Sequence, residues 1–218
     1  NGHGKMNVTE AIKQSCDVFF YEISKKIGIN KIAEVALDFG LGKIYDISMP
    51  SQKKGIVPNK EWKKNKTGES WYPGETLISA IGQGFVLTNP LQLAVMTSII
   101  ASNGKMIEPS ILKNQNKNFK TNTKYFTEIK IIKEAMYKVV NENKGTAFKA
   151  RLEDIIFSGK TGTSQVKRIS LSERESDDFR KKEQEWKNRD HALFVGYMPF
   201  DNPKFAISVV IEHGGSGA

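Results

Sequence analysis

In the stretch IIFSGKTGTSQV, residues 155–166, an apolar strand-like run leads directly into a lysine flanked by small polar residues. Glycines on either side of Lys160 and Thr161 let another backbone or a ligand approach the strand closely. Lys160 supplies a positive charge and the hydroxyls of Thr161 and Thr163 supply hydrogen-bond donors, so the stretch resembles a carboxylate receptor. An exposed backbone N–H at Thr163 would serve as half of an oxyanion hole. The alternative, a surface strand that happens to contain these residues, stays open.

Outward from this stretch, the sequence changes from helical to strand-like patterns at about residue 150. Two further apolar segments, residues 191–199 and 204–213, are joined by a short FDNP turn, which predicts an antiparallel hairpin. Upstream, Asn7 and Glu10 have the spacing of a helix capping box. We expect helices over residues 8–14, 17–28, 29–40, 88–104 and 129–140, and a loop or extended segment over residues 48–74. The prediction is an α+β fold, with a helical body over about residues 1–148 packed on an antiparallel sheet over about residues 154–213.

Composition limits the function classes. The chain has 218 residues, 39% of them hydrophobic, which is enough for a real core, and its longest apolar runs, residues 93–101 and 205–211, are too short to span a membrane. One cysteine, Cys16, excludes an internal disulfide. The net charge of +9 makes nucleic-acid binding a candidate function. The basic residues are scattered, however, and arginine is scarce. We therefore expect no nucleic-acid partner and keep this function only as an outside alternative.

A second polar element, Ser15-Cys16-Asp17, precedes Lys160 by 145 residues. Serine and aspartate are preferred helix N-caps, so a capping role is the simple alternative. The order Ser-x-x-Lys, then Ser-x-Asn or Asp, then Lys-Thr-Gly is, however, the signature of serine enzymes that react with penicillin. Two of these three motifs are present in the right order.

The sequence resembles the transpeptidase domain of class B penicillin-binding proteins, most closely those of the cell-elongation machinery. The resemblance is carried by four blocks in order: residues 2–29, 71–94 (WYPGETLISAIGQGFVLTNPLQLA), 159–166 and 190–217. It implies the α+β fold shared with serine β-lactamases and peptidoglycan D,D-transpeptidation, in which a serine forms an acyl-enzyme with the stem peptide and is also acylated by β-lactams. A D,D-carboxypeptidase and a non-catalytic β-lactam sensor of the same fold are the alternatives.

The resemblance also implies roles for residues. Ser15 matches the second-motif serine, which relays protons, and Asp17 matches its partner facing the catalytic lysine. In the third motif, Lys160 matches the conserved cation of the family pattern, and Thr163 contributes the oxyanion-hole N–H. Thr161 and Thr163 match the carboxylate-binding hydroxyls, and Gly162 keeps the strand open.

This chain departs from the family pattern in the Ser-x-x-Lys motif, which carries the nucleophile in this family. Four matches occur in the chain, starting at Ser51, Ser102, Ser110 and Ser164. None has the expected context, because the serine must begin a helix so that the lysine one turn later shares its face. We expect the nucleophile upstream of Asn1, and the chain to be the C-terminal part of a single transpeptidase domain, with an incomplete sheet and no activity alone.

Acyl transfer in this family requires no cofactor, but in the elongation-type members a structural zinc ion is held by a histidine, a cysteine and two upstream aspartates. His3 and Cys16 fall on the first two of these positions. From chemistry alone, a single histidine and a single cysteine are more often packing residues.

The resemblance implies a periplasmic domain anchored in the bacterial inner membrane. Its expected partners are peptidoglycan stem peptides, β-lactams, a glycan polymerase and membrane proteins of the elongation complex. Gln83 and Trp71 either line the cleft or serve in packing, and His191 is expected at a strand end. The charged residues 173–190 are expected to form a solvated helix or an excursion of the chain.

Overall fold

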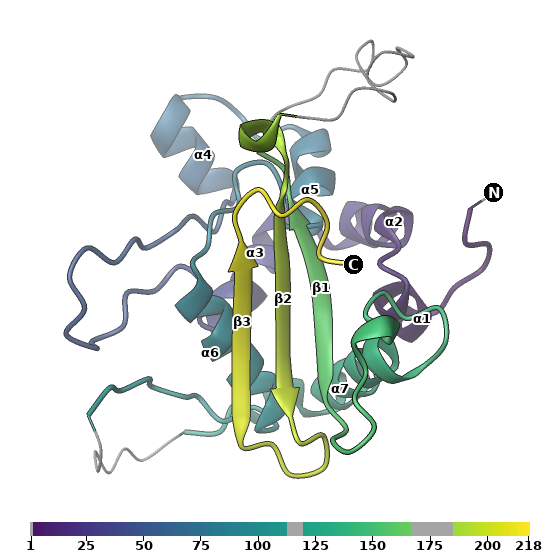
Figure 1. The fold of residues 1–218 in the computed structure, drawn as a ribbon. Helices are drawn as coiled ribbons and strands as arrows, with labels where there is room; N and C mark the ends of the chain where they lie inside the picture. The colour runs from purple at the N-terminus through teal and green to yellow at the C-terminus, as the bar shows by residue number, and fades with distance from the viewer. Residues whose placement is uncertain (1, 113–119, 167–184) are drawn as a thin grey trace.

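The structure is a computed structural model that describes residues 2–112, 120–166 and 185–218. It confirms the predicted α+β fold: helices lie behind one antiparallel sheet with the strand order β1-β2-β3 (Figure 1). The α-helices are α1 (Val8–Lys13), α2 (Asp17–Ile27), α3 (Ile29–Asp38), α4 (Lys60–Thr67), α5 (Pro73–Ala80), α6 (Pro90–Ala101) and α7 (Phe126–Asn141). The strands are β1 (Ser158–Ser164), β2 (His191–Met198) and β3 (Phe205–Ile211), and the short 3-10 helices are η1 (Thr123–Tyr125), η2 (Phe148–Ala150) and η3 (Trp186–Asn188).

The sheet register fixes what lies next to the Lys-Thr-Gly stretch. Lys160 is opposite Val195 and Gly162 is opposite Leu193, while the predicted hairpin joins β2 to β3. Helices α6 and α7 pack against one face of this sheet and close the core (Figure 1). Its largest fully buried side chain is Tyr197, which packs with apolar residues of α6 and α7 such as Ile99 and Ile129.

Caps account for where several helices begin. The Asn7 side chain accepts a hydrogen bond from the Glu10 N–H (2.9 Å), as the capping pattern predicts. Asn59 and Asn89 cap α4 and α6 in the same way. Proline occupies the first turn of α5 and α6, where its missing N–H is not needed.

One part of the helix prediction was wrong, because residues 48–74 are not all loop. They contain α4, and α5 begins at Pro73. The sequence hides α4 because its fully buried residue is a charged one, Lys63, so no apolar period marks the helix. The Lys63 ammonium group meets the Glu75 carboxylate at 2.6 Å and so joins α4 to α5.

Other predicted boundaries shift only slightly. The first strand starts at Ser158, because Ile155 and Ile156 are exposed and lie outside the ladder. The charged stretch at 173–190 falls outside the described residues except for its last six positions, 185–190, which include η3. Within the parts of the chain that are described, none of the helices combines the length and apolar character needed to cross a membrane.

Candidate active site

The end of α1 presents Ser15 toward β1. The N–H groups of Ser15 and Cys16 donate to the carbonyl oxygens of Ile12 (3.3 Å) and Ala11 (2.9 Å), which is the Schellman pattern of a helix C-terminus. Ser15 occupies the left-handed position of that motif, with φ 50°, where glycine is the usual residue. The capping alternative was wrong, since Cys16 is the N-cap of α2. The Ser15 hydroxyl instead accepts a short hydrogen bond from the Lys160 ammonium group.

Lys160 connects the two motifs that lie 145 residues apart in sequence. Its ammonium group also donates to the main-chain oxygen of Thr161 (2.7 Å). Burial lowers the pKa of Lys160 to about 8, while the negative charge of Asp17 acts in the opposite direction. A lysine with a pKa this close to neutrality holds its positive charge at pH 7 and still exchanges a proton readily.

Asp17 is the first residue of α2 and its side chain is exposed. A carboxylate in the first turn of a helix is favoured by the helix dipole. Asp17 acts on the site electrostatically, because its negative charge stabilises the protonated form of Lys160.

The two threonines of β1 have different surroundings. Thr163 is exposed, whereas Thr161 is buried and its hydroxyl lies 2.7 Å from the hydroxyl of Thr146. The Thr146 N–H donates to the main-chain oxygen of Lys13 (3.2 Å), so Thr146 joins the end of α1 to β1. The Thr163 hydroxyl accepts a hydrogen bond from the Gly217 N–H (3.4 Å) at the surface, so of the two hydroxyls it is the more accessible to a ligand.

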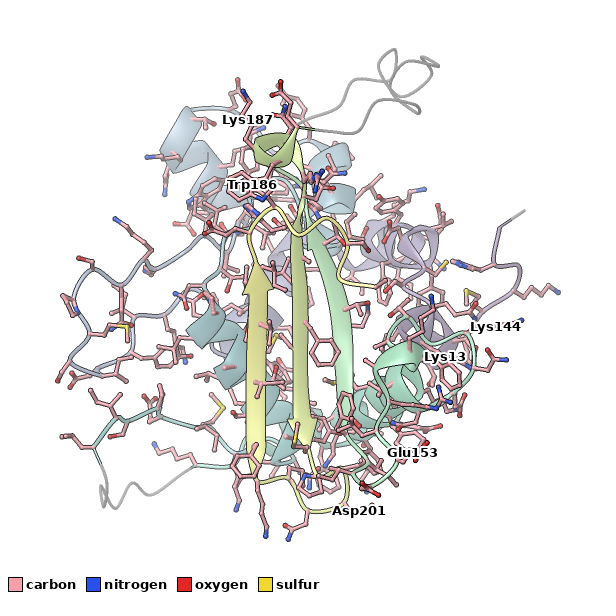
Figure 2. All side chains as sticks on the ribbon, viewed as in Figure 1. Lys13, Lys144, Glu153, Trp186, Lys187 and Asp201 are labelled. Atoms are coloured by element: carbon pink, nitrogen blue, oxygen red, sulfur yellow. The ribbon has the colours of Figure 1, made fainter. Side chains whose placement is uncertain are left out.

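Thr146 could not be predicted from the sequence, because a single threonine in a loop has no distinctive pattern. The loop that carries it follows α7, and Lys144 of this loop lies on the same side of the molecule as Lys13 (Figure 2). Gly145 in the same loop packs so tightly on the last carbonyl groups of α7 that a side chain there would clash.

The two glycines that flank Lys160 and Thr161 have different surroundings, because a Cβ atom on Gly162 would meet only the Leu193 Cβ atom, at 3.4 Å. A Cβ atom on Gly159 would collide with the ring of Phe194, so this glycine serves the core. Gly162 faces the main chain of Gly217, whose own Cβ would collide with the Gly162 carbonyl oxygen. The C-terminal segment therefore crosses the sheet at the third motif (Figure 1).

Gln83 binds the main chain at the end of β1. Its side-chain nitrogen donates to the Thr163 main-chain oxygen (2.7 Å), and its side-chain oxygen accepts from the Gln165 N–H (3.3 Å). Trp71 serves in packing, since its indole N–H donates to the Thr76 hydroxyl (2.8 Å).

His191 begins β2, as predicted for a strand-end histidine. Its Nδ1 accepts the His213 N–H (2.9 Å), so the ring joins the start of β2 to the end of β3.

The predicted zinc ligands do not form a metal site in the described ranges. No group of three or more histidine, cysteine, aspartate or glutamate side chains in residues 2–112, 120–166 and 185–218 is placed to hold a metal ion. His3 is exposed and Cys16 is buried. Two residues alone are fewer than the ligands that zinc takes in structural sites, so these residues do not fit the ion by themselves.

None of the four serines of the Ser-x-x-Lys matches begins a helix. Ser51 lies in a turn with φ 62°, Ser102 follows the last residue of α6, Ser110 lies in a loop and Ser164 ends β1. A cavity of about 440 Å³ is lined by residues 53–56 and 87–89, and none of the predicted site residues lines it.

Comparison with known proteins identifies the family. The model of the penicillin binding protein transpeptidase domain matches residues 1–218. The peptidoglycan D,D-transpeptidase MrdA of Acinetobacter baumannii is 35% identical over 100% of this chain and 34% of its own length. The chain thus spans about a third of the length of that curated relative.

Solved structures agree with this result. Helicobacter pylori PBP2 in complex with MreC has a TM-score of 0.86 and 33% identity, covering 97% of this chain and 37% of that one. A chain from a peptidoglycan synthase complex that coordinates polymerization and crosslinking has a TM-score of 0.79 and 30% identity, covering 99% of this chain and 35% of that one. With a family model that covers its whole length, the chain belongs to the penicillin-binding protein transpeptidase domain family.

Proposed function

We propose that this chain forms the second- and third-motif half of the active site of a peptidoglycan D,D-transpeptidase. The observation that carries the proposal is the hydrogen bond from Lys160 to Ser15, which unites two motifs 145 residues apart beside the open edge of β1. The similarity to D,D-transpeptidases over the whole chain supports the same reaction.

In the first step, the hydroxyl oxygen of the nucleophilic serine bonds to the carbonyl carbon of the penultimate D-alanine, and the bond from that carbon to the terminal D-alanine nitrogen breaks. The serine proton has to reach the leaving amine, and Ser15 together with Lys160 forms a relay for it. The Thr163 N–H stabilises the oxyanion, and the Thr163 hydroxyl and the Lys160 charge hold the terminal carboxylate.

In the second step, an amine of a neighbouring stem peptide attacks the ester carbonyl. The new amide bond forms, the ester bond to serine breaks, and the proton lost by the amine returns to the serine oxygen. A β-lactam enters the first step in the same way and leaves a stable acyl-enzyme.

The nucleophilic serine and its lysine belong, in this proposal, to a part of the protein outside these 218 residues, so the chain alone is inactive. The positions of Ser51, Ser102, Ser110 and Ser164 support this, since none of the four begins a helix. The chain is then the C-terminal part of one transpeptidase domain. Acyl transfer in this proposal requires no cofactor.

The proposed partners are stem peptides, β-lactams, a glycan polymerase and membrane proteins of the elongation complex, at the periplasmic face of the inner membrane. The relatives support this proposal: the H. pylori protein is solved with MreC, and another similar chain comes from a peptidoglycan synthase complex.

The test is peptide mass mapping of benzylpenicillin adducts on this chain and on the full-length protein that contains it. We expect an adduct only on the full-length protein, at a serine outside these 218 residues. An adduct on the isolated chain, at Ser15, Ser51 or Ser164, would contradict the assignment of the nucleophile. Product analysis with an added acceptor amine separates a transpeptidase from a carboxypeptidase, and steady-state turnover excludes a sensor.

A further inference from the structure

The edge of β1 that faces away from β2 is the surface on which a peptide would pair. Alternate residues of a strand direct their N–H and C=O groups to the same edge, so residues 161, 163 and 165 share the outer one. A peptide binds such an edge through main-chain hydrogen bonds. The Thr163 N–H proposed for the oxyanion hole lies on this edge.

Three polar groups of this edge already have partners inside the chain. The Thr161 oxygen accepts from the Lys160 ammonium group (2.7 Å), and the Thr163 oxygen accepts from the Gln83 side chain (2.7 Å). The Gln165 N–H donates to the Gln83 side-chain oxygen (3.3 Å). In a sheet, a neighbouring strand makes these same two bonds to positions 163 and 165, through one residue if it is parallel and through the two residues that flank the one opposite position 164 if it is antiparallel. The amide of Gln83 therefore takes the place of a paired strand at these two positions.

The end of α5 fixes Gln83 in this position. The N–H groups of Gly82 and Gln83 donate to the carbonyl oxygens of Ser79 (3.0 Å) and Ile78 (3.1 Å), so α5 also ends in a Schellman motif. Gly82 is in the left-handed conformation with φ 75°. The residue after it, here Gln83, usually makes a hydrophobic contact with the last turn of the helix. The polar side chain of Gln83 instead bonds to β1, 80 residues away in sequence. Departures of this kind from local sequence preference are expected at functional sites.

We propose that Gln83 is a specificity-determining residue that closes the peptide-binding edge of β1 beyond the Thr163 N–H. A ligand with an amide N–H directed at the Thr163 oxygen must displace the Gln83 amide, whereas a ligand without that group reacts with Gln83 in place. This inference rests on the proposed function, because it concerns how that active site admits its acyl donor.

The test compares two β-lactams with the same ring system and carboxylate. Benzylpenicillin carries an acylamino N–H, and penicillanic acid does not. Second-order acylation rate constants are measured on the full-length protein with and without Gln83→Ala. We expect the variant to react roughly two- to tenfold faster with benzylpenicillin, the effect of one hydrogen bond, and at an unchanged rate with penicillanic acid.

The chain offers a matched control in Gln52. Its side-chain amide also bonds to one main-chain N–H and one main-chain oxygen, here both of Tyr45, accepting from the N–H (3.2 Å) and donating to the oxygen (2.7 Å), in a loop without site residues. Gln52→Ala should leave the ratio of the two rate constants unchanged. If Gln83→Ala fails to fold, Gln83→Leu keeps the packing volume and makes the same comparison.

Two results would overturn the inference. An equal change of both rate constants would show that Gln83 positions the Thr163 N–H for every ligand. Unchanged rate constants for both ligands would show that the Gln83 amide does not compete with them. If the proposed function itself is wrong, the result differs: the unaltered full-length protein is acylated by neither compound.

Discussion

At the scale of single residues, the state of Lys160 is set by two opposing effects. Burial favours the neutral amine, and the nearby Asp17 carboxylate favours the charged form. The balance leaves a pKa of about 8, below the ordinary value of lysine. The side chain is therefore cationic at pH 7, as the proposed binding of a substrate carboxylate requires, and it loses this charge as the pH rises through its pKa.

The first prediction concerns pH. Because Lys160 loses its charge above pH of about 8, the acylation rate constant of the full-length protein with fluorescent penicillin should fall above that pH. Asp17→Asn removes the carboxylate that raises the pKa, so the fall should begin at lower pH. Asp201→Asn is the control, since Asp201 lies at the far end of the sheet in the β2–β3 turn (Figure 2). A midpoint that does not move with Asp17→Asn would rule out this coupling.

The second prediction concerns Thr146. Thr146→Val keeps the volume but removes the partner of the buried Thr161 hydroxyl, which costs about 1–3 kcal/mol of stability. The connection between α1 and β1 loosens, so we expect slower penicillin acylation as well as a lower melting temperature. Thr146→Ser retains the hydroxyl and should restore both values. If Thr146→Val and Thr146→Ser behave alike, the hydroxyl pair has no role.

Sequence reasoning found those site residues whose role is carried by a motif and missed those whose role is carried by a contact. Ser15, Asp17 and Lys160 were predicted, and the structure brings them together. Thr146 acts through the hydroxyl of Thr161, and nothing in its own neighbourhood in sequence marks it. Whether Gln83 lined the cleft or served in packing could not be decided from sequence, since its partners on β1 are 80 and 82 positions away.

At the scale of elements, the C-terminal ends of α1 and α5 position the side chains of Ser15 and Gln83 against β1. The end of α1 places Ser15 in the left-handed conformation, which costs a residue with a Cβ atom about 1 kcal/mol or more relative to glycine. A strained residue of this kind at a proposed proton relay is consistent with selection for function over stability.

The third prediction separates the effect of the Ser15 backbone conformation on stability from the effect of the Ser15 hydroxyl on acylation. Ser15→Gly relieves the strain and should raise the free energy of unfolding by about 1 kcal/mol, while it removes the hydroxyl and slows acylation. Ser15→Ala also removes the hydroxyl but keeps the Cβ atom, so it should slow acylation without the gain in stability. Thermal denaturation and acylation rates of both variants measure this. A Ser15→Gly protein no more stable than Ser15→Ala would contradict the strain argument.

The fourth prediction concerns the helix that sequence patterns missed. Lys63 is 1% exposed, contacts the Glu75 carboxylate and lies 4.2 Å from the ring centre of Tyr72. Lys63→Met preserves length but leaves the Glu75 carboxylate without its partner, so we expect a lower melting temperature. Lys64→Met, at the exposed neighbouring position, should have little effect. Equal melting temperatures for the two variants would mean that Lys63 does not hold α4 to α5.

At the scale of the whole molecule, the sheet has an open side at β3. Among the described residues no strand pairs with its outer edge, and Phe205, Val209 and Ile211 on this strand are exposed. An exposed apolar edge strand is a template for pairing with another chain.

The fifth prediction follows from this edge. The isolated 218-residue chain should self-associate, and Val209→Lys on β3 should reduce the association, as measured by light scattering after size-exclusion chromatography. Ile44→Lys replaces another exposed apolar side chain, which lies in a loop, and should not reduce it. Association that both variants weaken equally would indicate nonspecific hydrophobic contact in place of strand pairing.

The two Schellman caps have a consequence for how this chain tolerates change in length. Each residue added to an α-helix turns its end by about 100°, because a turn contains 3.6 residues. One residue inserted into α1 or α5 would therefore direct Ser15 or Gln83 away from β1, even if the helix remained stable. An insertion into the loop between α3 and α4 would leave both side chains in place. The lengths of two short helices are thus as much a part of the active site as the residues at their ends.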